Sequence, residues 1–227
     1  MKAKSQLNLY QVAPPELCNL DYKINARRPH LEAKCGHYRG DKEAVYHRVF
    51  SKARDFLNQD TGLGVPYVGL TSVYADRICK IGFSLISKMT CVENGEDFEV
   101  IKAFIDYIQE VGWRRVVEMK CVFGDMYDLN THADNKYGII DLDNNGFASL
   151  KRNEEILRLV NHTAANQCVL AIWNSYGMKV ISEEEHIGLM DALYDQLRKT
   201  FSVNRGREFY NETFPMCCDY LLMERKN

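Results

Sequence analysis

The stretch EVGWRRVVEMKCVFGD, residues 110–125, decides the fold that the sequence predicts. It begins with an indole, Trp113, and two guanidinium groups, and it then becomes strongly apolar. Over residues 113–127 the apolar positions are so frequent that a helix formed there would contact water on few sides. Such a helix is typical of the centre of a bundle. The stretch therefore predicts a buried central helix that is entered through a polar, cationic turn.

Helical spacing on both sides of this stretch supports the same fold class. Apolar residues recur three or four positions apart in several segments, and Ser182 with Glu185 has the pattern of a capping box. Residues 139–140 and 147–148 form at most one small β-hairpin. We expect a mainly α protein, a multi-helix bundle around a buried hydrophobic helix, with helices near residues 41–58, 67–89, 98–108, 113–127, 153–176, 182–201 and 208–214.

Composition limits the classes of protein to which the chain can belong. The chain has 227 residues, of which 46% are hydrophobic and 26% charged, and its formal net charge is −2. Residues 1–41 have little periodicity, so we expect an extended or weakly ordered N-terminal arm followed by a helical domain over residues 42–227. A nucleic-acid-binding protein normally carries a basic excess or a basic patch. The slightly negative net charge therefore predicts that the protein has no nucleic-acid partner.

The cysteines and the apolar runs indicate a compartment. None of the 8 cysteines forms a CxxC pair, and the first residues lack the pattern of a secretory signal. No apolar run approaches the roughly 18–20 residues that a membrane-spanning helix requires. We therefore expect free thiols, a cytoplasmic location and no membrane span.

A calcium-binding loop is one alternative. Asp141, Asp143, Asn145 and Gly146 resemble the first positions of an EF-hand, where oxygen ligands and a turn glycine are needed. The twelfth position is Arg152, where a bidentate glutamate belongs, and an Asn-Gly turn forms such a sequence without any ion. The alternative is an unrelated α-helical protein with a degenerate EF-hand-like loop that acts as an interaction module or a calcium-related protein.

Other metal and catalytic patterns are weak. Cys35 and His37, with Cys18 upstream and His47 downstream, lack the closely spaced cysteine pair of a zinc knuckle. The motifs GxSxG, HExxH, GxGxxG and the P-loop are absent. A catalytic carboxylate pair from distant positions stays open, but the sequence singles none out. We therefore predict no metal, no cofactor and no catalytic residue, with a non-enzymatic function favoured.

Trp113, Arg115, Val116 and Val117 form the pattern Trp-x-Arg-Val-Val. This pattern resembles part of the first homology region of the Bcl family of apoptosis regulators, and the resemblance extends over about residues 42–127. Upstream, the third homology region is similar to residues 67–78, through Tyr67, Tyr74, Ala75, Asp76 and Ile78. The chain departs from the family at Gly112, at Arg114, and at Thr71, where the family has a leucine.

The resemblance implies a cytoplasmic adaptor that regulates apoptosis by holding an amphipathic partner helix in a surface groove. Arg115 would pair with an aspartate of that helix through a charge-assisted contact. The alternative for the aliphatic residues is plain core packing, and the oligomeric state is left open. The residues expected to bind the partner helix are Arg115, Trp113, Phe98, Ile101, Phe104, Ile105 and Val116.

Overall fold

Strands and helices alternate along the chain. The computed structural model describes residues 40–57, 64–71, 74–96, 98–110, 117–132, 135–143, 148–175, 181–211 and 215–226. The strands are β1 Val65–Gly69, β2 Ile86–Glu93, β3 Glu118–Phe123, β4 Tyr137–Asp143, β5 Ala164–Ser175, β6 Phe201–Asn211 and β7 Pro215–Arg225. The helices are α2 Gly40–Leu57, α3 Ala75–Ile81, α4 Phe98–Glu110, α5 Leu129–His132, α6 Leu150–Thr163 and α7 Glu183–Leu197.

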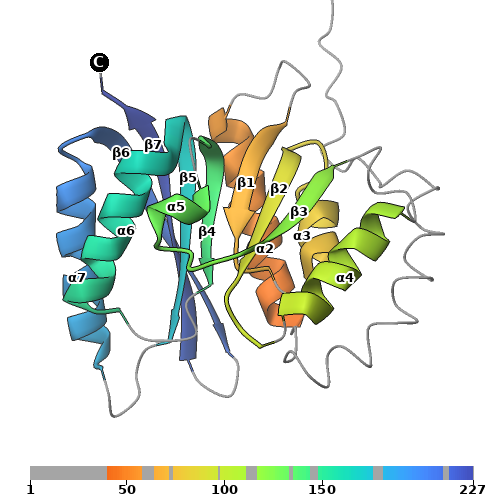
Figure 1. Ribbon diagram of the computed structural model, residues 1–227. Coiled ribbons are helices and arrows are strands. Elements are labelled where there is room, and N and C mark those ends of the chain that lie inside the picture. Colours follow the sequence, from red (N-terminus) through yellow and green to blue (C-terminus); the bar gives the residue numbers. More distant parts are fainter. Residues whose placement is uncertain are drawn as a thin grey trace, which may run out of the picture.

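The strands form one 7-stranded sheet in the order β3-β2-β1-β4-β5-β7-β6. The strands β1 to β5 are parallel, while β7 runs antiparallel to both of its neighbours. Helices cover both faces of the sheet, with α6 and α7 in front and α2 behind in Figure 1. This is a doubly wound α/β fold, because parallel strands joined by helices place those helices on both faces.

Each face of the sheet has its own core. Side chains from α2, α3 and α4 pack with alternate strand residues such as Ile139 and Val169. On the other face, side chains from α6 and α7 pack with the intervening residues, Ile140 and Leu170 among them. The two-residue period of a strand sends neighbouring side chains to opposite faces, so most positions of β4 and β5 are buried, and residues 168–173 of β5 are apolar throughout.

The predicted mainly α bundle is therefore wrong. Of the described part of the expected central helix, residues 118–123 form β3, which pairs with β2 at the edge of the described sheet. The expected helix over residues 153–176 ends at Thr163, and β5 follows directly. Residues 67–89 contain β1, α3 and β2, and residues 208–211 belong to β6. A strand buried on both faces has a continuous apolar run, which periodicity does not distinguish from a buried helix.

The predicted hairpin is also wrong in its described part, because Ile139 and Ile140 pair in parallel with β1 and β5. The helices with one wet face were predicted well. They are α2, α4 and α7, and the capping box of Ser182 and Glu185 is confirmed at the start of α7. Helices that expose one face keep the 3.6-residue period in their sequence, and this made them recognisable.

The predicted N-terminal arm lies almost wholly outside the described residues, so the boundary between residues 41 and 42 stays a prediction. Cys18, Cys35 and His37 also lie outside them, while His47 is exposed on α2. Within the part of the chain that the structure describes, no helix has the length and apolar character needed to cross a membrane.

Candidate functional site

The strand order indicates a candidate binding site at the carboxyl ends of the parallel strands. From β1 the chain moves outward to β2 and β3, and it then returns to place β4 on the other side of β1. In such sheets ligands bind beyond the carboxyl ends of the strands, at the point where the order reverses. That point lies between β1 and β4. Polar residues that end the strands around it are Thr71, Glu93, Asp125, Asp143, Asn174 and Ser175.

The carboxylates at the ends of β2 and β3 are oriented by nearby backbone. Glu93 Oε1 accepts hydrogen bonds from the backbone N–H of Asn94 at 3.0 Å and of Gly95 at 2.9 Å. Asp125 Oδ1 accepts one from the backbone N–H of Tyr127 at 2.8 Å. The backbone N–H of Gly124 donates to the Glu93 carbonyl oxygen at 3.1 Å, which ties the two strand ends together. Two acidic groups are thereby fixed on one side of the reversal point.

On the other side, Asp143 ends β4 with an unsatisfied oxygen. Lys42 Nζ, from the first turn of α2, donates to Asp143 Oδ2 at 2.5 Å, and the Lys42 ammonium lies 5.0 Å from the centre of the Trp173 ring. Asp143 Oδ1 is buried and has no hydrogen-bond partner among the described residues. A buried acceptor left unpaired costs about 1–3 kcal/mol. Such an atom at a ligand crevice points to a donor that arrives with the ligand.

Beneath Asp143, a second carboxyl connects four elements. Asp141 is 1% exposed; its Oδ2 accepts from Tyr46 Oη at 2.8 Å and from Tyr67 Oη. Its Oδ1 accepts from Trp173 Nε1 at 2.6 Å. Burial raises the pKa of Asp141 to about 6, against the lowering effect of these hydrogen bonds. The group joins α2, β1, β4 and β5 directly below the site, so it holds Lys42 and Asp143 in their relative positions.

Replacing Asp141 by asparagine is expected to remove a pH dependence of stability. The pKa of Asp141 is about 6 in the fold and 3.8 ordinarily, so the unfolded chain loses this proton first as the pH rises. The free energy of unfolding therefore falls between pH 4 and pH 6, by about 3 kcal/mol at 1.36 kcal/mol per pKa unit. Urea unfolding from pH 4 to pH 7 measures it.

The comparison is made as a difference between the wild type and the variant, because other carboxyls also titrate in this range. The difference in the free energy of unfolding between the wild type and Asp141→Asn is expected to shrink or change sign as the pH rises. Asp128→Asn, an exposed position, is the matched control and is expected to keep a constant gap. Parallel curves for wild type and Asp141→Asn would contradict the role of burial.

The residues predicted to bind a partner helix fall into two groups. Ile101, Phe104 and Ile105 are buried on α4 and belong to the core between that helix and the sheet. Phe98, at the start of α4, is half-buried and packs edge-on against Phe123, with ring centres 5.2 Å apart. The remaining three, Trp113, Arg115 and Val116, lie outside the described residues, so nothing in the structure tests their positions.

The calcium reading is wrong. Asp141 and Asp143 lie in a strand, two positions apart, and both side chains contact α2. The donors on Asp141 are two phenols and an indole, which leave no oxygen for an ion. Residues 144–147, with the expected turn, lie outside the described ones. The acids that end β2, β3 and β4 each follow an apolar run, and this recurring pattern is the signal that sequence reasoning missed.

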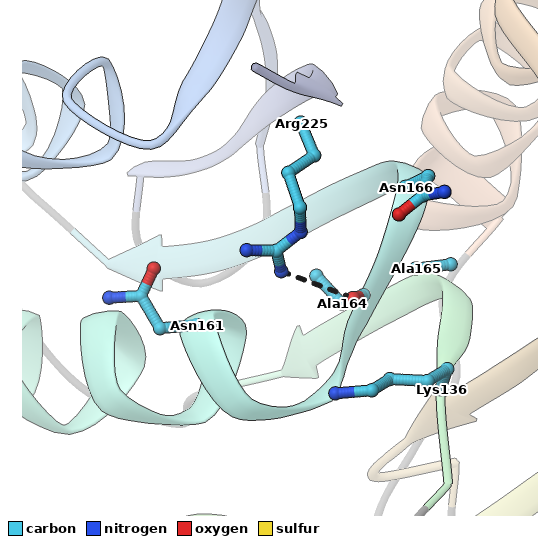
Figure 2. Close-up of a pocket in the computed structure, with 6 residues that line it drawn as sticks. All are labelled: Lys136, Asn161, Ala164, Ala165, Asn166 and Arg225. Carbon is cyan, nitrogen blue, oxygen red and sulfur yellow. Dashed lines mark hydrogen bonds between the residues drawn. The ribbon is translucent and has the colours of Figure 1, made fainter. Parts of the chain in front are cut away.

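A pocket at the opposite edge of the sheet does not belong to this site. It has a volume of about 400 Å³ and lies where β4 and β5 begin. Figure 2 shows one of its two cations against the backbone: Arg225 donates to the Ala164 carbonyl oxygen at 3.5 Å. The other cation, Lys136, donates to the carbonyl oxygen of His162. Its lining residues are Lys136, Asn161, Ala164, Ala165, Asn166 and Arg225.

Comparison with known proteins supports the fold. No protein-family model and no curated protein sequence matches the chain. M. jannaschii TYW2 in complex with AdoMet matches with a TM-score of 0.53 at 10% identity, over 86% of this chain and 80% of that one. An rRNA methylase from Streptococcus thermophilus matches with a TM-score of 0.55 at 13% identity, over 78% and 98%. An O-methyltransferase from Bacillus cereus in complex with SAH matches with a TM-score of 0.51 at 10% identity, over 94% and 93%.

These likenesses show a shared fold and overturn the Bcl resemblance. The solved structures named above include an rRNA methylase and an O-methyltransferase, and the α/β fold that the chain shares with them is not the helical bundle of the Bcl family. The predicted apoptosis regulator, its partner helix and the helical bundle are therefore wrong. The predicted exclusion of nucleic acid is also overturned, because it rested on net charge and an rRNA methylase has this fold.

Proposed function

We propose that this protein is an AdoMet-dependent methyltransferase with its cofactor at the carboxyl edge, where β1 and β4 meet. The observation that carries the proposal is the set of carboxylates at the ends of β2, β3 and β4, namely Glu93, Asp125 and Asp143. AdoMet bears a sulfonium and an ammonium group, so negative charge around the crevice suits it, whereas it would repel a phosphate-bearing ligand.

The loop after β1 is consistent with this choice of cofactor. Residues 70–81 contain no glycine. In dinucleotide-binding folds, glycines in this loop let the backbone approach a pyrophosphate at the start of the helix. AdoMet has no phosphate. The absence of glycine in this loop therefore disfavours a dinucleotide and leaves AdoMet as a candidate.

The chain's residues have distinct expected roles. Glu93 ends β2 and follows Gly69, the last residue of β1, by 24 residues. In related folds an acid about 20 residues further on accepts hydrogen bonds from ribose hydroxyls. Asp143 Oδ1, buried and unpaired, would accept from a donor on the cofactor or on the methyl acceptor. When bound, the cofactor supplies an electrophilic methyl group on sulfur. The protein orients the acceptor's lone pair toward that carbon and receives or relays the acceptor's proton.

Calorimetry with AdoMet tests the proposal directly, and Glu93→Gln is expected to weaken binding about 10-fold or more. Hydrogen bonds to a charged group contribute roughly 1.5–3 kcal/mol, and the amide lacks that charge. Glu118→Gln is the matched control. Glu118 is exposed at the first position of β3, far from the carboxyl ends of the strands, and its carboxylate lies 3.3 Å from Lys88 Nζ. The control is expected to bind like the wild type. Absence of AdoMet binding to the wild type would refute the proposal.

The acceptor and the compartment are part of the same proposal. Since an rRNA methylase shares the fold, RNA is one acceptor class to assay, with methyl-labelled AdoMet and separate protein and small-molecule fractions. The cytoplasmic location that the sequence predicts is retained. Label in the RNA fraction would assign that class, and label only in another fraction would exclude it.

A further inference from the structure

A second polar cluster lies on the opposite face of the sheet from Asp141. His186 belongs to the first turn of α7, while Cys217 and Asp219 lie two positions apart on β7. The three residues are buried, with exposed fractions of 1%, 0% and 6%. Cys217 pairs with Asn174 at the end of β5, so the cluster is close to the carboxyl edge but is covered by α7.

The three side chains converge through single atoms. His186 Nε2 is 3.0 Å from Asp219 Oδ2 and 3.4 Å from Cys217 Sγ. Cys217 Sγ is 3.6 Å from Asp219 Oδ2. Zinc binds sulfur at about 2.3 Å and nitrogen or oxygen at about 2.0–2.2 Å, so the ligand atoms of a tetrahedral site lie about 3.3–3.7 Å apart. The observed triangle nearly matches three corners of such a site.

This arrangement differs from a catalytic triad. In a triad the histidine uses one ring nitrogen for the nucleophile and the other for the carboxylate. Here the same nitrogen, His186 Nε2, faces both the thiol and the carboxylate. A relay of protons through the ring is therefore not available. Convergence of nitrogen, sulfur and oxygen on one point is the requirement for binding an ion.

A neighbouring cation fixes the carboxylate in a suitable orientation. Arg207 Nε donates to Asp219 Oδ1 at 2.6 Å, which leaves Oδ2 directed at His186 and Cys217. Partners of this kind, which hold a ligand from outside, are usual around protein metal sites. Without a metal, the N–H of His186 and the S–H of Cys217 would both donate to Oδ2, and this hydrogen-bonded cluster is the competing description.

We infer that His186, Cys217 and Asp219 bind one zinc ion, which fastens α7 to β7. The fourth position would be taken by water or by a further group, as is usual where the protein supplies three ligands. Zinc at this place is separate from methyl transfer, because the ligands lie on the α7 face while Lys42 and Asp143 lie on the α2 face. The inference therefore does not depend on the proposed function.

Zinc content tests the inference with a closely matched pair of variants. The purified chain is treated with chelator, exposed to zinc, desalted and analysed by elemental analysis. We expect about one zinc per chain for the wild type and close to none for Cys217→Ser. The control is Cys218→Ser, which removes the adjacent, fully buried thiol on the other face of β7 and is expected to retain zinc.

Cobalt provides a second measurement on the same chains. Wild type and Cys218→Ser loaded with Co²⁺ are expected to show a thiolate-to-cobalt absorption band that Cys217→Ser lacks. Should Cys217→Ser fail to fold, calorimetry of the wild type with zinc and the thermal midpoint before and after chelation decide. A wild type that holds no zinc, or zinc retained in Cys217→Ser, would overturn the inference in favour of the hydrogen-bonded cluster.

Discussion

Asp143→Asn is expected to lower kcat/KM for the proposed methyl transfer by about 100-fold or more. The substitution removes the negative charge that lies 2.5 Å from Lys42 Nζ, and both side chains are largely buried, with exposed fractions of 13% and 21%. Truncating one partner of a buried pair typically costs about 2–5 kcal/mol, because the other charge is left without a counter-ion. It also replaces Oδ1, the buried oxygen that has no hydrogen-bond partner among the described residues.

Three comparisons make this result interpretable. Asp128→Asn carries the same chemical change at an exposed position after β3 and is expected to leave the rate unchanged. Lys42→Gln removes the other partner and is expected to have a smaller effect if Asp143 contacts the reactants itself. AdoMet affinity, measured separately, tells whether the loss lies in cofactor binding or in the transfer step. A variant that keeps more than half of the wild-type rate would remove Asp143 from the site.

The sequence predicted the elements that expose one face to solvent and missed a strand that is buried on both faces. Amphipathic helices α2, α4 and α7 expose one side, and their spacing predicted them. The strand β5 is buried on both sides, and its run from Ala164 resembles the continuation of α6. A continuous apolar run fits a buried helix and a buried strand equally well. The end of α6 at Thr163 therefore could not be located without knowing that β5 pairs with β4 and β7.

The sequence singled out part of the candidate site, but for calcium binding and not for the function proposed here. Asp141 and Asp143 attracted notice as calcium ligands, and in a strand the same two-residue spacing instead puts both on one face. Their partners come from distant elements: Lys42 lies 101 positions before Asp143, and Trp173 lies 32 after Asp141. Contacts over such separations leave no periodic trace. The pair Cys217 and Asp219 has the same spacing, and it acquires meaning only beside His186.

Trp173→Ala is expected to lower the free energy of unfolding by about 4 kcal/mol. The side chain is 0% exposed, and its ring lies 4.5 Å from that of Tyr46 and 5.7 Å from that of Tyr210. Removing a buried aromatic ring typically costs about 3–5 kcal/mol through lost contacts and the cavity left behind. Urea unfolding at pH 7, followed by circular dichroism, measures the change. Phe209→Ala is the control, since that ring is 51% exposed, and a loss under about 1 kcal/mol is expected there.

A second substitution separates packing from hydrogen bonding. Trp173→Phe keeps most of the ring contacts but removes the N–H that donates to Asp141 Oδ1 at 2.6 Å. The loss is expected to be about 1–3 kcal/mol at pH 7, where Asp141 is ionised and would lack one donor. At pH 4, where the protonated carboxyl has less need of donors, the loss should shrink. Equal losses at both pH values would mean that the indole acts through its volume alone, and that the Asp141 network does not position the site above it.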